Sequence, residues 1–134
     1  MKPVVLYVED DPRSRKVMQL LLVHQLSYPH VYILEDSTNF LARANSFTPL
    51  PDIVFLDIHV TPYDGFEMLA MLRQDTRWDH VPVIALTASV MNEEVQRLRT
   101  AGFNGCIGKP LHLETFPELL QQILDGEEVW TIVN

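Results

Sequence analysis

Positively charged side chains are scarce in this sequence. It has 134 residues, with ten Lys and Arg against eighteen Asp and Glu, and a formal net charge of −8 at pH 7. Its lysines are confined to Lys2, Lys16 and Lys109. Binding to nucleic acid without sequence preference depends on Lys and Arg clustered against the phosphates. The sequence therefore predicts no nucleic-acid partner.

Cysteine is almost absent, and long apolar segments are missing as well. Cys106 is the single cysteine, so no disulfide can form within the chain, and the five histidines lack the spacing of a zinc site. The apolar runs fall short of the roughly 20 residues that a membrane-spanning helix needs. Met1-Lys2-Pro3 leads directly into a strand-like segment, without a signal peptide. We expect no membrane segment and a cytoplasmic location.

Five short apolar segments predict the strands of a sheet. Three are strong, at residues 3–8, 52–56 and 81–86, and two are weaker, at 31–34 and 105–107. Their apolar residues are continuous and do not alternate with polar ones. This pattern is typical of strands buried on both faces of a parallel sheet.

Helical patterns separate these strands. The first helix begins at Asp11-Pro12 and runs to about Leu26, the second covers 37–47, and the third follows Asp64-Gly65. The fourth covers 92–101 and ends at Gly102. The last is opened by the capping-box spacing at Thr115. Strands and helices that alternate with short connections predict a doubly wound α/β fold. We expect one domain over 1–134, with the core fold in 1–125 and a C-terminal tail at 126–134.

Polar residues follow four of the five predicted strands. They are Glu9, Asp10 and Asp11 after the first strand, Asp57 after the third, Thr87 (followed by the small residue Ala88) after the fourth, and Lys109 after the fifth. Ligands of open parallel sheets bind outside the carboxyl ends of the strands. We therefore expect these side chains to share one pocket.

The acidic residues of this set predict a metal site. Carboxylates brought together repel one another, and their oxygens favour a hard cation such as Mg²⁺, with Glu9 and Asp10 binding it directly or through water. Asp57 is the candidate nucleophile for an acyl phosphate. Lys109 and the metal would neutralise the phosphoryl charge. Thr87 would donate a hydrogen bond to the phosphoryl group, and Ala88 leaves room beside it.

These motifs resemble the response-regulator receiver family of two-component signalling, of the stand-alone single-domain type. Val8-Glu9-Asp10-Asp11-Pro12 is similar to the family's acidic pair and proline, and Asp57 with Asp64-Gly65-Phe66-Glu67 is similar to its phosphoacceptor loop. Leu86-Thr87-Ala88 and Lys109-Pro110 resemble its switch threonine and its lysine. The resemblance covers essentially the whole chain, because the motifs occur in order at the strand ends.

The resemblance implies further properties. It implies a flavodoxin-like sheet with strand order 2-1-3-4-5, and phosphorylation by a histidine kinase or phosphotransfer protein. It adds the backbone carbonyl of His59 to the metal ligands and a cis peptide before Pro110. It places the contact with a downstream protein at about 92–124, with homodimerisation as another route for output. The domain would assist its own phosphorylation and hydrolysis and would not be a turnover enzyme.

The sequence also departs from the family pattern. Cys106 occupies the position where the family usually has an aromatic switch residue, so coupling between Thr87 and a rotating ring is in question. Pro62 comes one place later than in the common loop, and Gly108 stands where a polar residue is common. These departures affect transmission of the signal and leave the site chemistry intact.

Other functions remain as alternatives. One is a receiver that binds its partner constitutively, without phosphorylation. A haloacid-dehalogenase-type phosphatase also uses Asp, Mg²⁺ and Lys, but its loop requires a second aspartate where this chain has His59. A flavodoxin requires a phosphate loop after the first strand, where Glu9 and Asp10 would repel a phosphate.

Several residues also have simpler structural interpretations. We expect Asp11 and Asp64 to cap helices, and Cys106 to be a small buried hydrophobic residue. The first helix carries more apolar residues, at 20–23, than one buried stripe needs. This surplus would bind a partner helix or lie under the tail residues 129–133, and we favour the tail.

Overall fold

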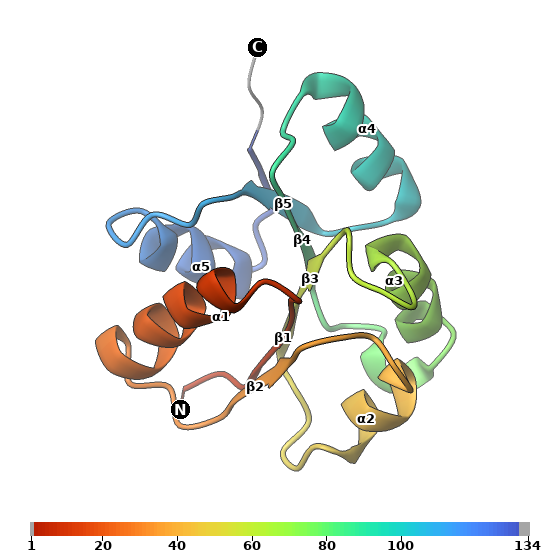
Figure 1. The fold of residues 1–134 in the computed structure, drawn as a ribbon, viewed down its shortest axis with the longest axis horizontal. Coiled ribbons are helices and arrows are strands. Elements are labelled where there is room, and N and C mark those ends of the chain that lie inside the picture. Colours follow the sequence, from red (N-terminus) through yellow and green to blue (C-terminus); the bar gives the residue numbers. More distant parts are fainter. Residues whose placement is uncertain (1, 132–134) are drawn as a thin grey trace.

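The computed structural model describes residues 2–131 as a parallel sheet with helices on both faces (Figure 1). Within these residues the sheet has six strands in the order β2-β1-β3-β4-β5-β6. The bounds are β1 Val5–Val8, β2 Val31–Leu34, β3 Ile53–Asp57, β4 Val83–Thr87, β5 Gly105–Gly108 and β6 Val129–Trp130. All neighbouring strands pair in parallel. The predicted α/β fold and strand order 2-1-3-4-5 are confirmed.

The helices form one layer on each side of the sheet. Their bounds are α1 Pro12–Gln19, α2 Phe40–Ser46, α3 Gly65–Arg73, α4 Asn92–Ala101 and α5 Phe116–Leu124. A π-helical segment, η1 Leu20–Gln25, continues α1, and a short 3₁₀ turn, η2 Thr76–Trp78, follows α3. Figure 1 shows α1 and α5 on one face and α2, α3 and α4 on the other. None of the helices in residues 2–131 is long and apolar enough to cross a membrane.

Two apolar cores fill the space between the sheet and these layers. Tyr7 and Phe55 pack toward Met18 and Phe116 on the α1 and α5 side. Residues next to them in the strands, such as Leu56, pack on the opposite side, where α3 and α4 lie. Successive side chains of a strand point to opposite faces. Both faces of β1, β3 and β4 are therefore buried, which explains their continuous apolar sequences.

The helix ends follow local sequence signals in most places. Asp11 caps α1 by accepting from the backbone N–H groups of Arg13 and Ser14, and Asp64 forms a complete capping box with Glu67 at α3. Gly102 ends α4 with a φ of 107°, a conformation that glycine adopts without steric cost. These expectations are confirmed.

One expected capping bond and one predicted helix start were wrong, although the last helix does begin directly after Thr115. At α5 the side chain of Thr115 makes no capping hydrogen bond, so the expected capping box does not form. The second helix begins at Phe40 and not at residue 37. Ser37 is buried, and its hydroxyl both donates to the Tyr63 carbonyl oxygen and accepts from the Tyr63 N–H, at 2.7 Å each. That pairing with a distant loop holds Ser37 outside the helix.

The C-terminal tail adds a sixth strand that the sequence did not predict. Gly105 pairs with Val129 and Cys106 with Trp130. The tail was expected to cover the first helix, and this prediction was wrong for its described residues, because β6 extends the edge of the sheet beyond β5. Leu20 therefore stays 49% exposed. The predicted tail residues 132 and 133 lie outside the described part of the chain.

Candidate active site

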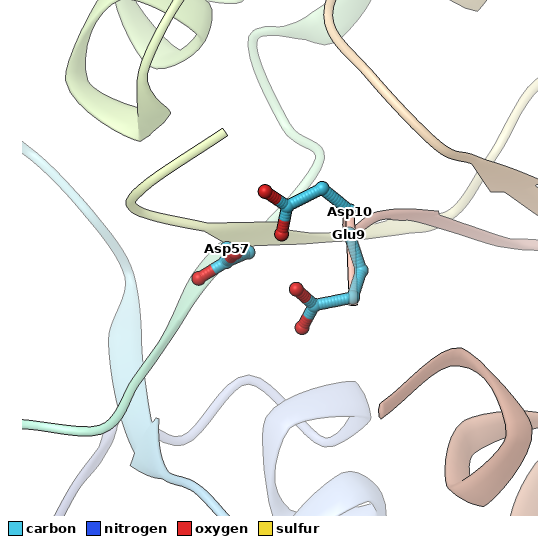
Figure 2. Close-up of side chains that lie close together, drawn as sticks. All are labelled: Glu9, Asp10 and Asp57. Atoms are coloured by element: carbon cyan, nitrogen blue, oxygen red, sulfur yellow. The ribbon is translucent and has the colours of Figure 1, made fainter. Parts of the chain in front are cut away.

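Three carboxylates meet at the carboxyl edge of two adjacent strands, β1 and β3. Glu9 and Asp10 follow β1, and Asp57 is the last residue of β3, which pairs with β1 in register. One carboxylate oxygen from each residue lies within 4.8 Å of the others. Figure 2 shows the three side chains converging from adjacent strands. Glu9 and Asp57 are buried, whereas Asp10 is exposed, so the group opens to solvent on the Asp10 side.

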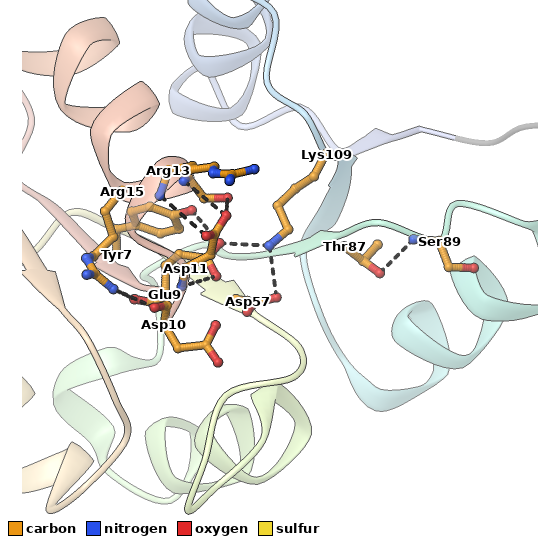
Figure 3. Close-up of polar contacts among 11 residues, drawn as sticks. Tyr7, Glu9, Asp10, Asp11, Arg13, Arg15, Asp57, Thr87, Ser89 and Lys109 are labelled. Atoms are coloured by element: carbon orange, nitrogen blue, oxygen red, sulfur yellow. Dashed lines mark hydrogen bonds and ion pairs between the residues drawn. The ribbon is translucent and has the colours of Figure 1, made fainter.

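Lys109 brings a positive charge to these carboxylates. It follows β5, and its Nζ lies 2.8 Å from Glu9 Oε1 and 3.3 Å from Asp57 Oδ1 (Figure 3). Burial alone would lower the pKa of Lys109, but the hydrogen bond to Glu9 and the charges of Asp57 and Glu9 outweigh it and raise that pKa. The ammonium group therefore stays charged at neutral pH and partly balances the acidic cluster.

Glu9 is more tightly held than a solvated acid. Its Oε1 accepts from the Tyr7 hydroxyl at 2.7 Å as well as from Lys109, and its Oε2 accepts from the Asp11 N–H at 3.3 Å. Both of its oxygens are thus engaged within the protein. Burial, together with the negative charge of Glu9, raises the pKa of Tyr7, so its hydroxyl stays protonated and donates.

Tyr7 was not among the site residues predicted from sequence. A signal for it exists, because it lies two residues before Glu9 in a strand and residues at that spacing share a face. Read as part of a continuous apolar run, however, Tyr7 is indistinguishable from a core residue. Its ring does lie in the core, fully buried, and only its hydroxyl reaches the site.

Asp11 lies beside the cluster without belonging to it. Its carboxylate accepts from Arg13 and Ser14 as the cap of α1, and the hydrogen bond from the Ser14 hydroxyl lowers the pKa of Asp11. The strand end is further fixed by Arg15, whose guanidinium donates to the backbone carbonyl oxygens of Glu9 and Asp10 at 2.9 and 2.8 Å. The turn that presents the two acids is therefore held by the helix that follows it.

Thr87, Ala88 and His59 lie along a neighbouring cavity and loop. Thr87 is 5% exposed at the end of β4, and its Oγ1 accepts from the Ser89 N–H at 3.1 Å (Figure 3). Ala88 and His59 are exposed. His59 and Thr87 both line a cavity of about 290 Å³ that extends toward Phe66. Space for a further group thus exists between α3 and the start of α4.

Cys106 lies in β5, away from the acidic cluster. It is fully buried, as expected for a small hydrophobic residue, and its Sγ donates to the Thr131 carbonyl oxygen at 3.6 Å. Burial raises the pKa of the thiol. The predicted switch position therefore contacts the tail strand and carries no aromatic ring.

The donor set at the strand ends fits a hard divalent cation. Glu9, Asp10 and Asp57 together carry three negative charges, and Lys109 supplies one positive charge. Like charges at these distances are unfavourable without a counter-ion, and clustered carboxylate oxygens are the ligands that Mg²⁺ prefers. Because both oxygens of Glu9 already accept hydrogen bonds, Asp10 and Asp57 are the better placed direct ligands.

Fold and site together define a flavodoxin-like α/β domain with an acidic pocket at the carboxyl edge of its sheet. The comparison with known families is specific: residues 5–122 match the response regulator receiver domain. The chain belongs to this family of two-component signalling proteins. Members are signalling proteins and not turnover enzymes, and the family binds Mg²⁺ through its acidic residues.

Individual relatives resemble the chain at modest sequence identity. The chain is 32% identical over 107 residues to stress response regulator protein 1 of Meyerozyma guilliermondii, a match that covers 80% of this chain and 49% of that protein. The chemotaxis response regulator CheY4 of Vibrio cholerae superposes with a TM-score of 0.81 at 25% identity, covering 92% of this chain and 99% of that one. The receiver domain of the sensor histidine kinase PA1611 from Pseudomonas aeruginosa has a TM-score of 0.77 at 24% identity, covering 91% and 97%. The chain thus spans about half the length of that stress response regulator.

Proposed function

We propose that this receiver domain accepts a phosphoryl group on Asp57 and signals through contact with another protein. The observation that carries the proposal is the position of Lys109 Nζ, 3.3 Å from Asp57 Oδ1 beside the cluster of Glu9, Asp10 and Asp57. An aspartate that lies next to a fixed cation and a set of metal-binding oxygens has the groups that phosphoryl transfer requires.

The transfer is a substitution at phosphorus. A carboxylate oxygen of Asp57 forms a bond to the phosphorus of the donor while the bond between that phosphorus and the donor breaks, and the electron pair leaves with the donor. The donor is a phosphohistidine of a kinase or phosphotransfer protein, the class of partner with which receiver domains interact. Lys109 balances the negative charge on the phosphoryl oxygens.

Bound Mg²⁺ would neutralise further charge on the phosphoryl oxygens. Asp10, Asp57 and the backbone carbonyl of His59 would hold it, with Glu9 acting through water. The likeness to the PA1611 receiver domain supports this part of the proposal, because that protein has a magnesium ion coordinated in its active site cleft. Thr87 would turn its hydroxyl from the Ser89 N–H toward the phosphoryl group, next to the small side chain of Ala88.

Output would pass through the surface at about 92–124 and the strand beside it. Movement of Thr87 would displace the loop that leads into α4 and bias this surface between two states. The guanidinium of Arg99 in α4 lies over the ring of Trp130 in β6, 4.6 Å from the centroid of that ring. The tail strand is therefore part of the surface that a downstream protein, or a second copy of the chain, would contact.

Phosphorylation of Asp57 is tested by mass. The protein is incubated with Mg²⁺ and a small acyl phosphate, and the intact mass is expected to rise by one phosphoryl group. D57N should gain no mass. D79N is the control: it alters an exposed aspartate that precedes β4, away from the pocket at the carboxyl ends of the strands, and it should gain mass as wild type does. An unchanged wild-type mass, or an equal gain in D57N, would refute the proposal.

One observation favours constitutive binding as a second candidate. Cys106 is buried and bonded to the tail, so the residue at the switch position has no ring that could rotate. A pull-down that compares untreated protein with a beryllofluoride-treated sample separates the two functions. A partner captured only after treatment supports the phosphorylation switch, and a partner captured equally from both samples supports the constitutive module.

A further inference from the structure

A tyrosine hydroxyl is bonded to a buried carboxylate beneath the acidic pocket. Tyr7 and Glu9 are both fully buried, and the Tyr7 hydroxyl lies 2.7 Å from Glu9 Oε1. They are two residues apart at the end of β1, so both side chains lie on the face toward α1 and α5. A phenylalanine would fill the same apolar space. The hydroxyl therefore has its effect through Glu9.

The same oxygen of Glu9 also binds Lys109. Oε1 accepts from the Tyr7 hydroxyl at 2.7 Å and from Lys109 Nζ at 2.8 Å, while Oε2 accepts from the Asp11 N–H at 3.3 Å. Three donors from different directions thus fix one carboxylate. If the Tyr7 donor is removed, the carboxylate can rotate, and the ammonium group bonded to it moves as well.

Lys109 has room to move. A cavity of about 180 Å³ borders Tyr7 and Lys109, and its lining includes Asp11 but not Asp57. Lysine has a flexible four-carbon stem, so its ammonium group is placed by its partners more than by its own rotamer. The carboxylate of Asp11 attracts the ammonium group toward this cavity, whereas the guanidinium of Arg13, which lines the same cavity, repels it. The contact with Glu9 opposes that shift.

We propose that Tyr7 is a positioning residue for Lys109, acting through Glu9 to hold the ammonium group beside Asp57. This inference rests on the proposed phosphoryl transfer to Asp57. Tyr7 touches neither the phosphoryl group nor the metal, so its removal should slow transfer while donor binding and Mg²⁺ binding stay nearly unchanged. A group held slightly out of place is expected to cost about tenfold in rate.

The first measurement is the rate of phosphorylation by a small acyl phosphate at several donor and Mg²⁺ concentrations. Y7F should lower the limiting rate about tenfold, with the donor and Mg²⁺ half-saturation concentrations changed by less than about threefold. Y28F is the matched control, because Tyr28 is also buried in the core on the α1 and α5 side but is not bonded to Glu9. It should react at the wild-type rate. An unaltered limiting rate in Y7F overturns the proposal.

A double-mutant cycle distinguishes positioning from a general loss of structure. In the K109A background, adding Y7F should have almost no effect, because the group that Tyr7 positions is gone. If Y7F slows wild type and K109A by the same factor, its effect does not pass through Lys109 and the proposal is wrong. If wild type itself takes no phosphoryl group, the proposed function is wrong. If wild type is phosphorylated and Y7F reacts at the same rate, only the role of Tyr7 is wrong.

A spectroscopic measurement keeps the test decisive if Y7F is less stable. The sequence has just three lysines, so ε-¹³C-lysine labelling gives three signals that K109A assigns. In folded Y7F at low temperature, the Lys109 signal should shift from its wild-type position, and those of Lys2 and Lys16 should not. A Lys109 signal that stays in place would show that the ammonium group does not depend on Tyr7.

Discussion

The side chains of Lys109 and Asp57 meet at 3.3 Å although 52 residues separate them in the chain. β5 and β3 are not neighbours in the sheet, since β4 lies between them. Their contact is possible because all of these strands are parallel and end at the same edge. The pocket is thus a product of the topology, and its electrostatics depend on the one ammonium group that reaches across β4.

Removing this ammonium group should destabilise the fold. K109A leaves Glu9 and Asp57 buried without their shared cation, and we expect the free energy of unfolding without divalent ions to fall by about 3 to 5 kcal/mol. Urea unfolding at pH 7 measures it, with K16A, which alters an exposed lysine, as the control. Adding D57N to K109A should restore part of the loss. Equal stability of K109A and wild type would contradict this account of the pocket.

The contribution of Lys109 should also depend on pH. Its pKa is raised above the usual 10.5, so the folded protein holds this proton more tightly than the unfolded chain. The stabilisation is therefore complete below the usual lysine pKa and is lost as the pH rises through the raised one. The difference in unfolding free energy between wild type and K109A should be constant near neutrality and shrink in strongly alkaline solution. If the difference in unfolding free energy grew at alkaline pH, the pKa of Lys109 would be lowered by folding and not raised.

Mg²⁺ should stabilise the protein through the acidic cluster. A free concentration of about 100 times the Kd adds about 2.7 kcal/mol by mass action, which raises the melting temperature. D10N removes a ligand and a negative charge, so it should melt slightly higher than wild type without Mg²⁺ and gain little from it. D79N should respond as wild type does. An undiminished response in D10N would remove Asp10 from the proposed ligands.

The sheet was predictable because its signals are local. The segments that form β1, β3 and β4 are continuous apolar runs, and this property alone indicates burial on both faces. β6 was missed because two residues carry no periodicity, and its pairing depends on the close approach of Val129 to Gly105, a tertiary feature. At Thr115 the local signal is present without its structural consequence: the sequence has the capping-box spacing, but the Thr115 side chain makes no capping hydrogen bond.

The pocket was predictable to the level of which residues meet. Acidic and basic residues at the ends of parallel strands must share an edge, and the structure brings together Glu9, Asp10, Asp57 and Lys109. The sequence could not indicate how the oxygens of Glu9 are shared, because that depends on side-chain direction. For the same reason the sequence could not distinguish Tyr7 from a core residue.

The two helix starts that share a capping-box pattern should respond differently to mutation. D64A removes a side chain that accepts from the Glu67 N–H at 2.9 Å, and it should cost about 1 kcal/mol of unfolding free energy. T115A removes a side chain that makes no capping bond, so the change should stay within about 0.5 kcal/mol. Urea denaturation of both variants measures the contrast. Equal losses would show that the spacing matters more than the bond.

The pairing of β6 with β5 should depend on the missing side chain of Gly105. A Cβ there would lie 2.5 Å from the Val129 carbonyl oxygen, a backbone atom that cannot yield without breaking the β6 pairing. We expect G105A to lower the unfolding free energy by about 1 to 3 kcal/mol and to speed hydrogen exchange at the Thr131 amide, which donates to the Cys106 carbonyl oxygen at 3.1 Å. G108A is the matched control, since its Cβ would meet a methyl group of Val90 at 3.0 Å, and a side chain can shift. If G108A sped hydrogen exchange at the Thr131 amide as much as G105A does, the close approach of the Val129 backbone would not be the reason that position 105 requires glycine.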